Sequence, residues 1–206
     1  DHRGALPLTE RLVAVFGAQL EALDASVRAD LLRAALDGIQ GGLASSTGAR
    51  FAMRNVAPAV KAGLLVVNPL GELVFRHPLV RAAVIHQAVP QERRDAHRDL
   101  AGLYDEVLVR RAAHLAEATV EPDQDVADVL ARAAKLSIRR GGLSVGVEWL
   151  RRAAELSTDR DRRAELFADA VFLAARAGRP GGAEDLLHGT GTSERDSALA
   201  VLADSY

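Results

Sequence analysis

Apolar residues recur at helical spacing near the start of the chain. A first stripe follows Thr9, a residue type that caps helix N-termini, and consists of Leu12, Val13, Phe16 and Leu20. A second stripe follows Ser26 and stops at Gly38; its inward positions are Leu31, Leu32, Ala35 and Leu36. The pattern predicts two helices, then a Gly/Ser/Thr-rich loop over 38–48. A further helix is expected from about Ala49 to Gly63, with Pro58 opening a new first turn.

The periodicity then changes from helical to extended. Residues 64–67 and 72–75, which are apolar apart from Glu72, are runs of strand length, and between them lie Asn68, Pro69 and Gly71, which favour a tight turn. Helical patterns resume at His77 and again at Pro90, the second running to about Val109. Helices, one β-hairpin and further helices indicate a winged-helix-like module over residues 8–108.

Beyond residue 109 every pattern is helical. A helix is expected from Pro122 to Arg140, with acidic residues in its first turn and Gly141 and Gly142 after its end. Residues 158–161 form a capping-box pattern that begins another helix, and 192–206 is a third helical stretch. A shift of 36 residues aligns small and apolar positions, pairing Ala134 with Ala170, Gly142 with Gly178, Gly146 with Gly182, Glu148 with Glu184 and Leu150 with Leu186. We therefore expect stacked helical hairpins of the tetratricopeptide (TPR) type over 109–206, incomplete at the C-terminal end. The fold class expected for the chain is mainly α.

Charge and composition limit the functions to consider. The 206 residues contain 26 Lys plus Arg, 28 Asp plus Glu and no cysteine. A chain without cysteine has no disulfide framework, thiol nucleophile or Cys-ligated zinc. The two halves are each close to neutral, so direct binding to DNA phosphates is disfavoured. No apolar run reaches the length of a membrane span, and we expect a cytoplasmic protein without membrane contact.

The sequence contains no complete catalytic or metal-binding motif. The Gly-rich stretches 43–50 and 141–146 lack the Lys and Ser/Thr of a P-loop. His86, His97 and His114 have no metal-binding spacing, and no Ser lies in a nucleophile elbow. The expectation is a protein that is not an enzyme, with no catalytic residue, no metal site and no cofactor of its own.

One group of residues is distinctive, the block from Phe75 to Arg81 directly after the second strand. His77 lies at the strand-to-helix junction, and Pro78 suits the first helical turn. Polar side chains and amides at such a junction can bind an anion. The alternative from the residues alone is that His77 only caps the helix.

This block and the following 88–98 closely resemble the large ATP-binding LuxR-family transcriptional regulators, which are STAND-type ATPases. Residues 111–116 and 148–156 are similar to the helical region of that family. Ile85 departs from the pattern, because many members have Tyr at this place. The resemblance implies a fragment of a longer regulator in which a P-loop ATPase domain precedes a winged-helix-like module, TPR-like helices and a DNA-binding helix-turn-helix. Similar blocks also occur in ATPases linked to nucleotide cyclases, so a cyclase domain in the longer protein is an open alternative.

The resemblance also implies a role. The segment would relay the nucleotide and inducer state to self-association and DNA binding, with ATP or ADP and DNA bound by domains of the longer protein. His77 would be a sensor of the nucleotide phosphate. Two alternatives stay open, a helical scaffold that binds a protein or peptide and a small-molecule sensor domain.

Overall fold

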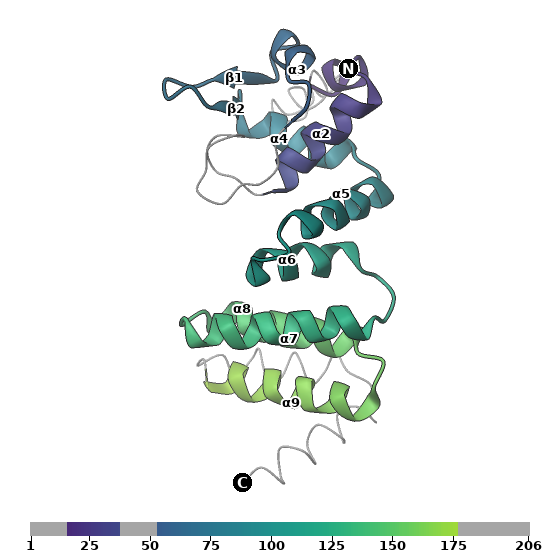
Figure 1. Cartoon of the computed structure of the whole chain (residues 1–206), viewed down its shortest axis with the longest axis vertical. Coiled ribbons are helices and arrows are strands. Elements are labelled where there is room, and N and C mark those ends of the chain that lie inside the picture. The colour runs from purple at the N-terminus through teal and green to yellow at the C-terminus, as the bar shows by residue number, and fades with distance from the viewer. Residues whose placement is uncertain (1–15, 38–52, 177–206) are drawn as a thin grey trace, which may run out of the picture. The chain divides into compact units, whose positions relative to one another are not determined.

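The computed structural model describes residues 16–37 and 53–176. Within them the protein is mainly α-helical with one two-stranded hairpin, as the sequence predicts (Figure 1). The chain divides into two compact units, residues 1–103 and 104–206. The sequence placed the boundary after residue 108. The predicted helix start at Thr9, the loop 38–48, the second copy of the 36-residue repeat beyond residue 176 and the helix 192–206 lie outside the described residues.

The first unit is built on helix α2 (Ala25–Leu36), which packs against α4 (Pro78–Gln87) and α5 (Pro90–Leu103). Residues 16–21 are also helical and precede α2. An apolar core joins these helices to the hairpin; its fully buried members include Leu31, Ala35, Leu64, Leu65 and Val80. Two arginine contacts reinforce the packing. Arg33 of α2 pairs with Asp99 of α5 at 2.7 Å, and Arg81 Nε donates to Ala35 O at 2.7 Å.

Helix α3 (Ala57–Lys61) is shorter than the sequence pattern predicts. Residues 53–56 are not helical, so the part of the expected helix that the structure describes begins only at Ala57. Pro58 lies in the first turn, where its missing N–H has no cost. Gly63 then turns the chain toward the hairpin with a φ of 72°, a value that favours glycine.

The hairpin pairs β1 (Leu65–Val67) with β2 (Leu73–Phe75) in antiparallel register, with Val66 opposite Val74. The predicted turn residues form its tip. Asn68 Oδ1 accepts from the amides of Leu70 and Glu72, both at 2.9 Å, and Gly71 has a φ of 81°. A side chain thus takes the place of backbone partners in the turn.

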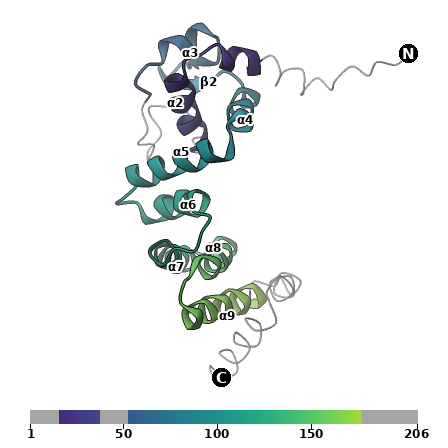
Figure 2. The same ribbon diagram turned by 90° about the vertical axis from the view of Figure 1, so that its right-hand side faces the viewer.

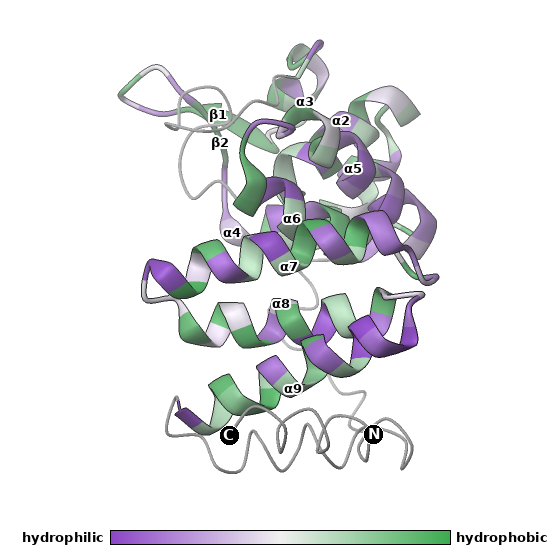
Figure 3. Cartoon of the chain, turned by 60° about the horizontal axis from the view of Figure 1, so that its bottom comes forward, coloured by the Kyte–Doolittle hydropathy of each residue, from purple (hydrophilic) through white to green (hydrophobic). Residues whose placement is uncertain are grey.

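The second unit stacks α6 (Leu108–Ala118), α7 (Gln124–Arg139), α8 (Leu143–Leu156) and α9 (Arg160–Arg176) in chain order (Figures 1 and 2). Helices α7 and α8 form a hairpin, and α9 packs on α8. Apolar and polar bands alternate along these helices (Figure 3). Their inward positions form one core that contains Leu130, Ala134, Leu150 and Ala170.

Three predicted boundaries in and near this unit are wrong. The helix from Pro90 ends at Leu103 instead of continuing to Val109. After Gly102, a residue unfavourable in helices, the chain turns so that the Tyr104 ring becomes fully buried. Helix α7 is capped by Asp123, which accepts from the Val126 amide at 3.0 Å, so Pro122 lies outside it. Asp159, rather than Thr158, caps α9 by accepting from the amides of Asp161 and Arg162.

Candidate functional site at the His77 junction

His77 lies between the hairpin and α4, as the sequence predicts. The Arg76 amide still donates to Leu64 O at 2.9 Å, which extends the hairpin ladder by one residue. His77 is extended, with φ −149° and ψ 145°, and Pro78 is the first residue of α4. A strand thus passes into a helix within one residue, and His77 is exposed at that point.

The imidazole of His77 caps the helix. Its Nδ1 accepts a hydrogen bond from the Leu79 amide at 3.1 Å. A nitrogen that accepts a hydrogen bond carries no proton, so the proton of the neutral ring lies on Nε2. One ring can therefore cap α4 through Nδ1 and present an N–H donor through Nε2. The capping role and the anion-binding role are not exclusive alternatives.

The backbone amides of this helix end are largely occupied. Pro78 has no N–H, Leu79 donates to His77 Nδ1, and Val80 donates to His77 O at 2.9 Å. An amide cradle for an anion, part of the sequence-based expectation, is therefore not available at Leu79 or Val80. The positive end of the helix dipole and the His77 side chain remain.

The two arginines of the block differ in how they contact their own unit. The Arg76 guanidinium packs over Gly63, with Nη1 2.9 Å from the position that a Cβ of residue 63 would occupy. The half-buried Arg81 bonds the carbonyl of Ala35 at the end of α2. Arg81 therefore has a structural role, whereas Arg76 is exposed, as His77 is, so its guanidinium is a second nitrogen donor at the junction.

Further along, in residues 85–93, side chains stabilise the end of α4 and the start of α5. Ile85 is half-buried against the core of the first unit, a place that suits an apolar side chain. Arg93 Nη1 donates to the carbonyls of Ala88 at 3.0 Å and Ile85 at 3.3 Å, which satisfies the C-terminal end of α4. Glu92 accepts from the Val89 amide at 2.9 Å and so caps α5.

The other histidines of the described segments are dispersed. His86 is exposed, His97 is half-buried, and His114 is buried and stacked on Tyr104 with ring centroids 5.7 Å apart. Across residues 16–37 and 53–176, no group of three or more metal-ligating side chains is placed to hold an ion. In the same ranges no helix combines the length and apolar character needed to cross a membrane.

Comparison of the chain with protein-family models, with curated proteins and with solved structures gives no match. The site must therefore be judged from its own residues and geometry.

Proposed function

We propose that this chain is the coupling region of a nucleotide-dependent transcription regulator of the ATP-binding LuxR type. The single observation that carries the proposal is the geometry of His77, an exposed imidazole whose capped Nδ1 leaves an Nε2–H donor at a helix N-terminus. The block around it, residues 75–84, is the one that resembles this family. In the proposal ATP or ADP is bound by a domain outside this chain.

The mechanism is a shift between two arrangements of the longer protein. In the resting arrangement His77 Nε2–H donates to a phosphate oxygen of bound ADP. Exchange for ATP, together with inducer, removes that contact and favours an arrangement that self-associates and binds DNA. A charge-assisted hydrogen bond contributes roughly 1.5–3 kcal/mol, enough to change the ratio of the two arrangements tenfold or more.

The capping contact determines the design of the test. His77→Ala removes both the cap and the Nε2–H donor, whereas His77→Asn keeps a capping side chain and removes the imidazole. In the longer protein we expect both variants to release ADP about tenfold faster and to raise basal transcription. Only His77→Ala should also lower the stability of the first unit.

The outcomes separate the role of the Nε2–H donor from that of the helix cap. ADP release and basal transcription that stay unchanged in His77→Asn would overturn the phosphate-sensing role. ADP release that changes only in His77→Ala would mean that the cap, and not the donor, matters.

A second candidate function is a helical scaffold for a protein partner. It is favoured by the consecutive packing of α6 on α7, α7 on α8 and α8 on α9, which forms the extended surface that stacked hairpins use for binding. The two functions predict different effects of surface changes. Charge reversal on exposed positions of α7 and α9 should abolish partner capture in the scaffold and leave ADP release unchanged.

A further inference from the structure

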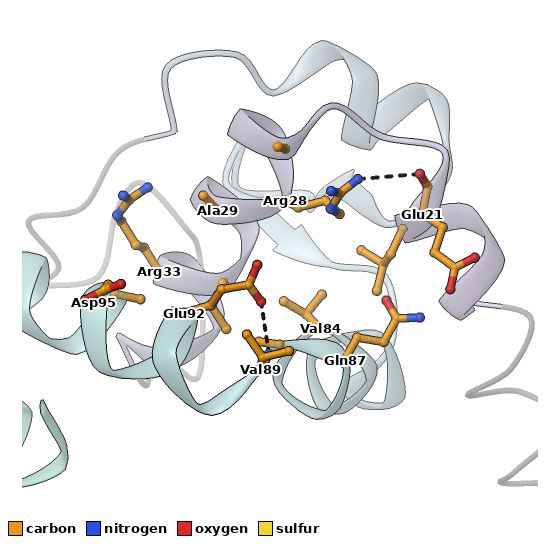
Figure 4. A pocket seen from close by; sticks show the side chains of 14 residues that line it. Glu21, Arg28, Ala29, Arg33, Val84, Gln87, Val89, Glu92 and Asp95 are labelled. Atoms are coloured by element: carbon orange, nitrogen blue, oxygen red, sulfur yellow. Dashed lines mark hydrogen bonds between the residues drawn. The ribbon is translucent and has the colours of Figure 1, made fainter. Parts of the chain in front are cut away.

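The first unit contains a pocket of about 560 Å³ that is separate from the His77 junction. It lies between α2 on one side and the end of α4 with the start of α5 on the other (Figure 4). Its volume falls within the range of small-molecule sites in proteins. All of its lining residues belong to this one unit.

Small and aliphatic side chains make the inner wall. Ala25 and Ala29 of α2, Ala88 after the end of α4 and Ala96 of α5 all line the pocket, so methyl groups stand where larger side chains would fill the space. The remaining apolar lining is aliphatic and comes from Leu20, Leu32, Val84 and Val89. This wall favours an apolar ligand body.

The charges of the side chains that line the pocket do not sum to zero. Arg33 is neutralised by Asp30 and Asp99, two carboxylates outside the pocket. Asp95 is in turn paired with Arg98, which is also outside the lining. Glu21, Glu92 and Arg28 remain, a net charge of minus one.

The positive group and one of the acids have different hydrogen-bond partners. Arg28 Nη1 donates to the carbonyls of Leu23 at 2.5 Å and Glu21 at 3.5 Å, so its guanidinium is held against the main chain. The Glu92 carboxylate stands over the apolar wall near Val89 and Val84, and its Oε2 accepts from the Val89 amide (Figure 4). A negative group above an apolar cavity suits a cationic head on an apolar body.

We propose that this pocket binds a small organic amine, with its apolar part against the alanine-lined wall and its ammonium group at Glu92. The proposal is independent of the nucleotide role of His77, which lies outside the pocket lining. In this proposal the first unit has a ligand-binding site of its own.

Three probes with the same apolar body and different heads test the proposal on the whole chain. They are 4-phenylbutylamine, 4-phenylbutanol and 5-phenylpentanoate, titrated while backbone amide signals are followed by NMR. We expect saturable shifts confined to residues that line the pocket, with a Kd of about 1 mM or tighter for the amine. The alcohol should bind about three- to fivefold more weakly, the scale of an ion pair open to solvent, and the acid more weakly still.

Variants locate the binding. Ala29→Leu fills the cavity and should weaken amine binding more than tenfold, and Ala25→Leu gives a second filling variant if the first disturbs the fold. Glu92→Gln retains an acceptor for the Val89 amide and removes the charge, so it should lower amine affinity about three- to fivefold and leave the alcohol unaffected. Ala113→Leu, exposed on α6 and outside the pocket, is the matched control and should change nothing.

The results that overturn the proposal are equally specific. Equal or tighter binding of the acid would refute the charge preference. The absence of saturable shifts for all three probes at about 5 mM would refute the site itself. Amine binding that survives both filling variants would place it elsewhere.

Discussion

Gly146 of α8 lies so close to Ile138 of α7 that a methyl group on its Cα would come within 2.4 Å of Ile138 Cγ1. Carbon atoms do not approach so closely without a shift of one of the helices or side chains. The glycine therefore sets how near the two helices of the α7–α8 hairpin can pack.

Gly146→Ala should destabilise the second unit. Overpacking of a tight contact costs roughly 1–3 kcal/mol, which exceeds the gain of about 0.5–1 kcal/mol from replacing a helical glycine. Chemical denaturation followed by the helical circular dichroism signal measures the change. Gly102→Ala is the control, since nothing lies within 4 Å of its added methyl group, and it should be neutral or stabilising. Equal behaviour of the two variants would contradict the close approach.

A second prediction concerns Gln124 at the start of α7. Its Oε1 accepts from Ser157 Oγ at 3.0 Å and from the amides of Thr158 at 3.1 Å and Asp159 at 3.4 Å, so one side chain fixes the α8–α9 turn. Ser157 is fully buried, but its hydroxyl can still donate to Asp159 O at 3.1 Å when Gln124 is lost, so the cost is that of a net hydrogen bond, about 0.5–1.5 kcal/mol. Gln124→Ala should lower the free energy of unfolding by that amount. In a double-mutant cycle, Ser157→Ala should cost less when Gln124 is already Ala, and strict additivity would contradict the contact.

Local chemistry explains what the sequence predicted correctly. The hairpin follows from Asn68 and Gly71, whose turn-forming properties act over a few residues and need no tertiary partner. The cap at His77 likewise follows from residue type and spacing. In each case the chemistry that determines the structure is contained in a short stretch of sequence.

The remaining features depend on distant residues. The chain leaves the helical path near Tyr104 because that ring becomes buried, and the sequence pattern alone continues to Val109. Asp159 rather than Thr158 caps α9. Thr158 Oγ1 instead donates a hydrogen bond to Gln124, which lies 34 positions earlier in the chain. The pocket likewise arises only when alanines of α2, of α5 and of the α4–α5 junction come together in the fold. No local signal distinguishes these alanines from the many others in the chain.

A third prediction uses pH. Partial burial raises the pKa of the Asp169 carboxyl on α9 above its ordinary 3.8, and the nearby positive charges of Lys135 and Arg162 only partly offset this. Because the folded-state pKa is raised, this carboxyl stabilises the folded protein below about pH 3.8. That stabilisation is lost as the pH rises through the folded-state pKa. Asp169→Asn should therefore raise stability at pH 7, by about 0.5 kcal/mol for a position partly open to water. The gain should vanish in acid.

Thermal unfolding of both proteins at pH 7 and at pH 3.5 tests this prediction. Glu165→Gln is the control one helical turn earlier on α9. Glu165 pairs with Arg162 at 2.8 Å and also repels Asp169, so its neutralisation removes an attraction together with a repulsion and should give no net gain at pH 7. A gain from Asp169→Asn that is the same at both pH values would contradict the link to its carboxyl group.

The last prediction concerns the proton on His77. Because Nδ1 accepts from the Leu79 amide, the neutral ring should be the Nε2–H tautomer, which long-range ¹H–¹⁵N NMR spectra of the side chain distinguish directly. Loss of the cap in His77→Ala should lower stability by about 0.5–2 kcal/mol, and His77→Asn should restore most of it. Finding the proton on Nδ1, or equal stability for all three proteins, would show that His77 does not cap α4. The position of its Nε2–H, on which the proposed phosphate contact depends, would then no longer follow from the helix.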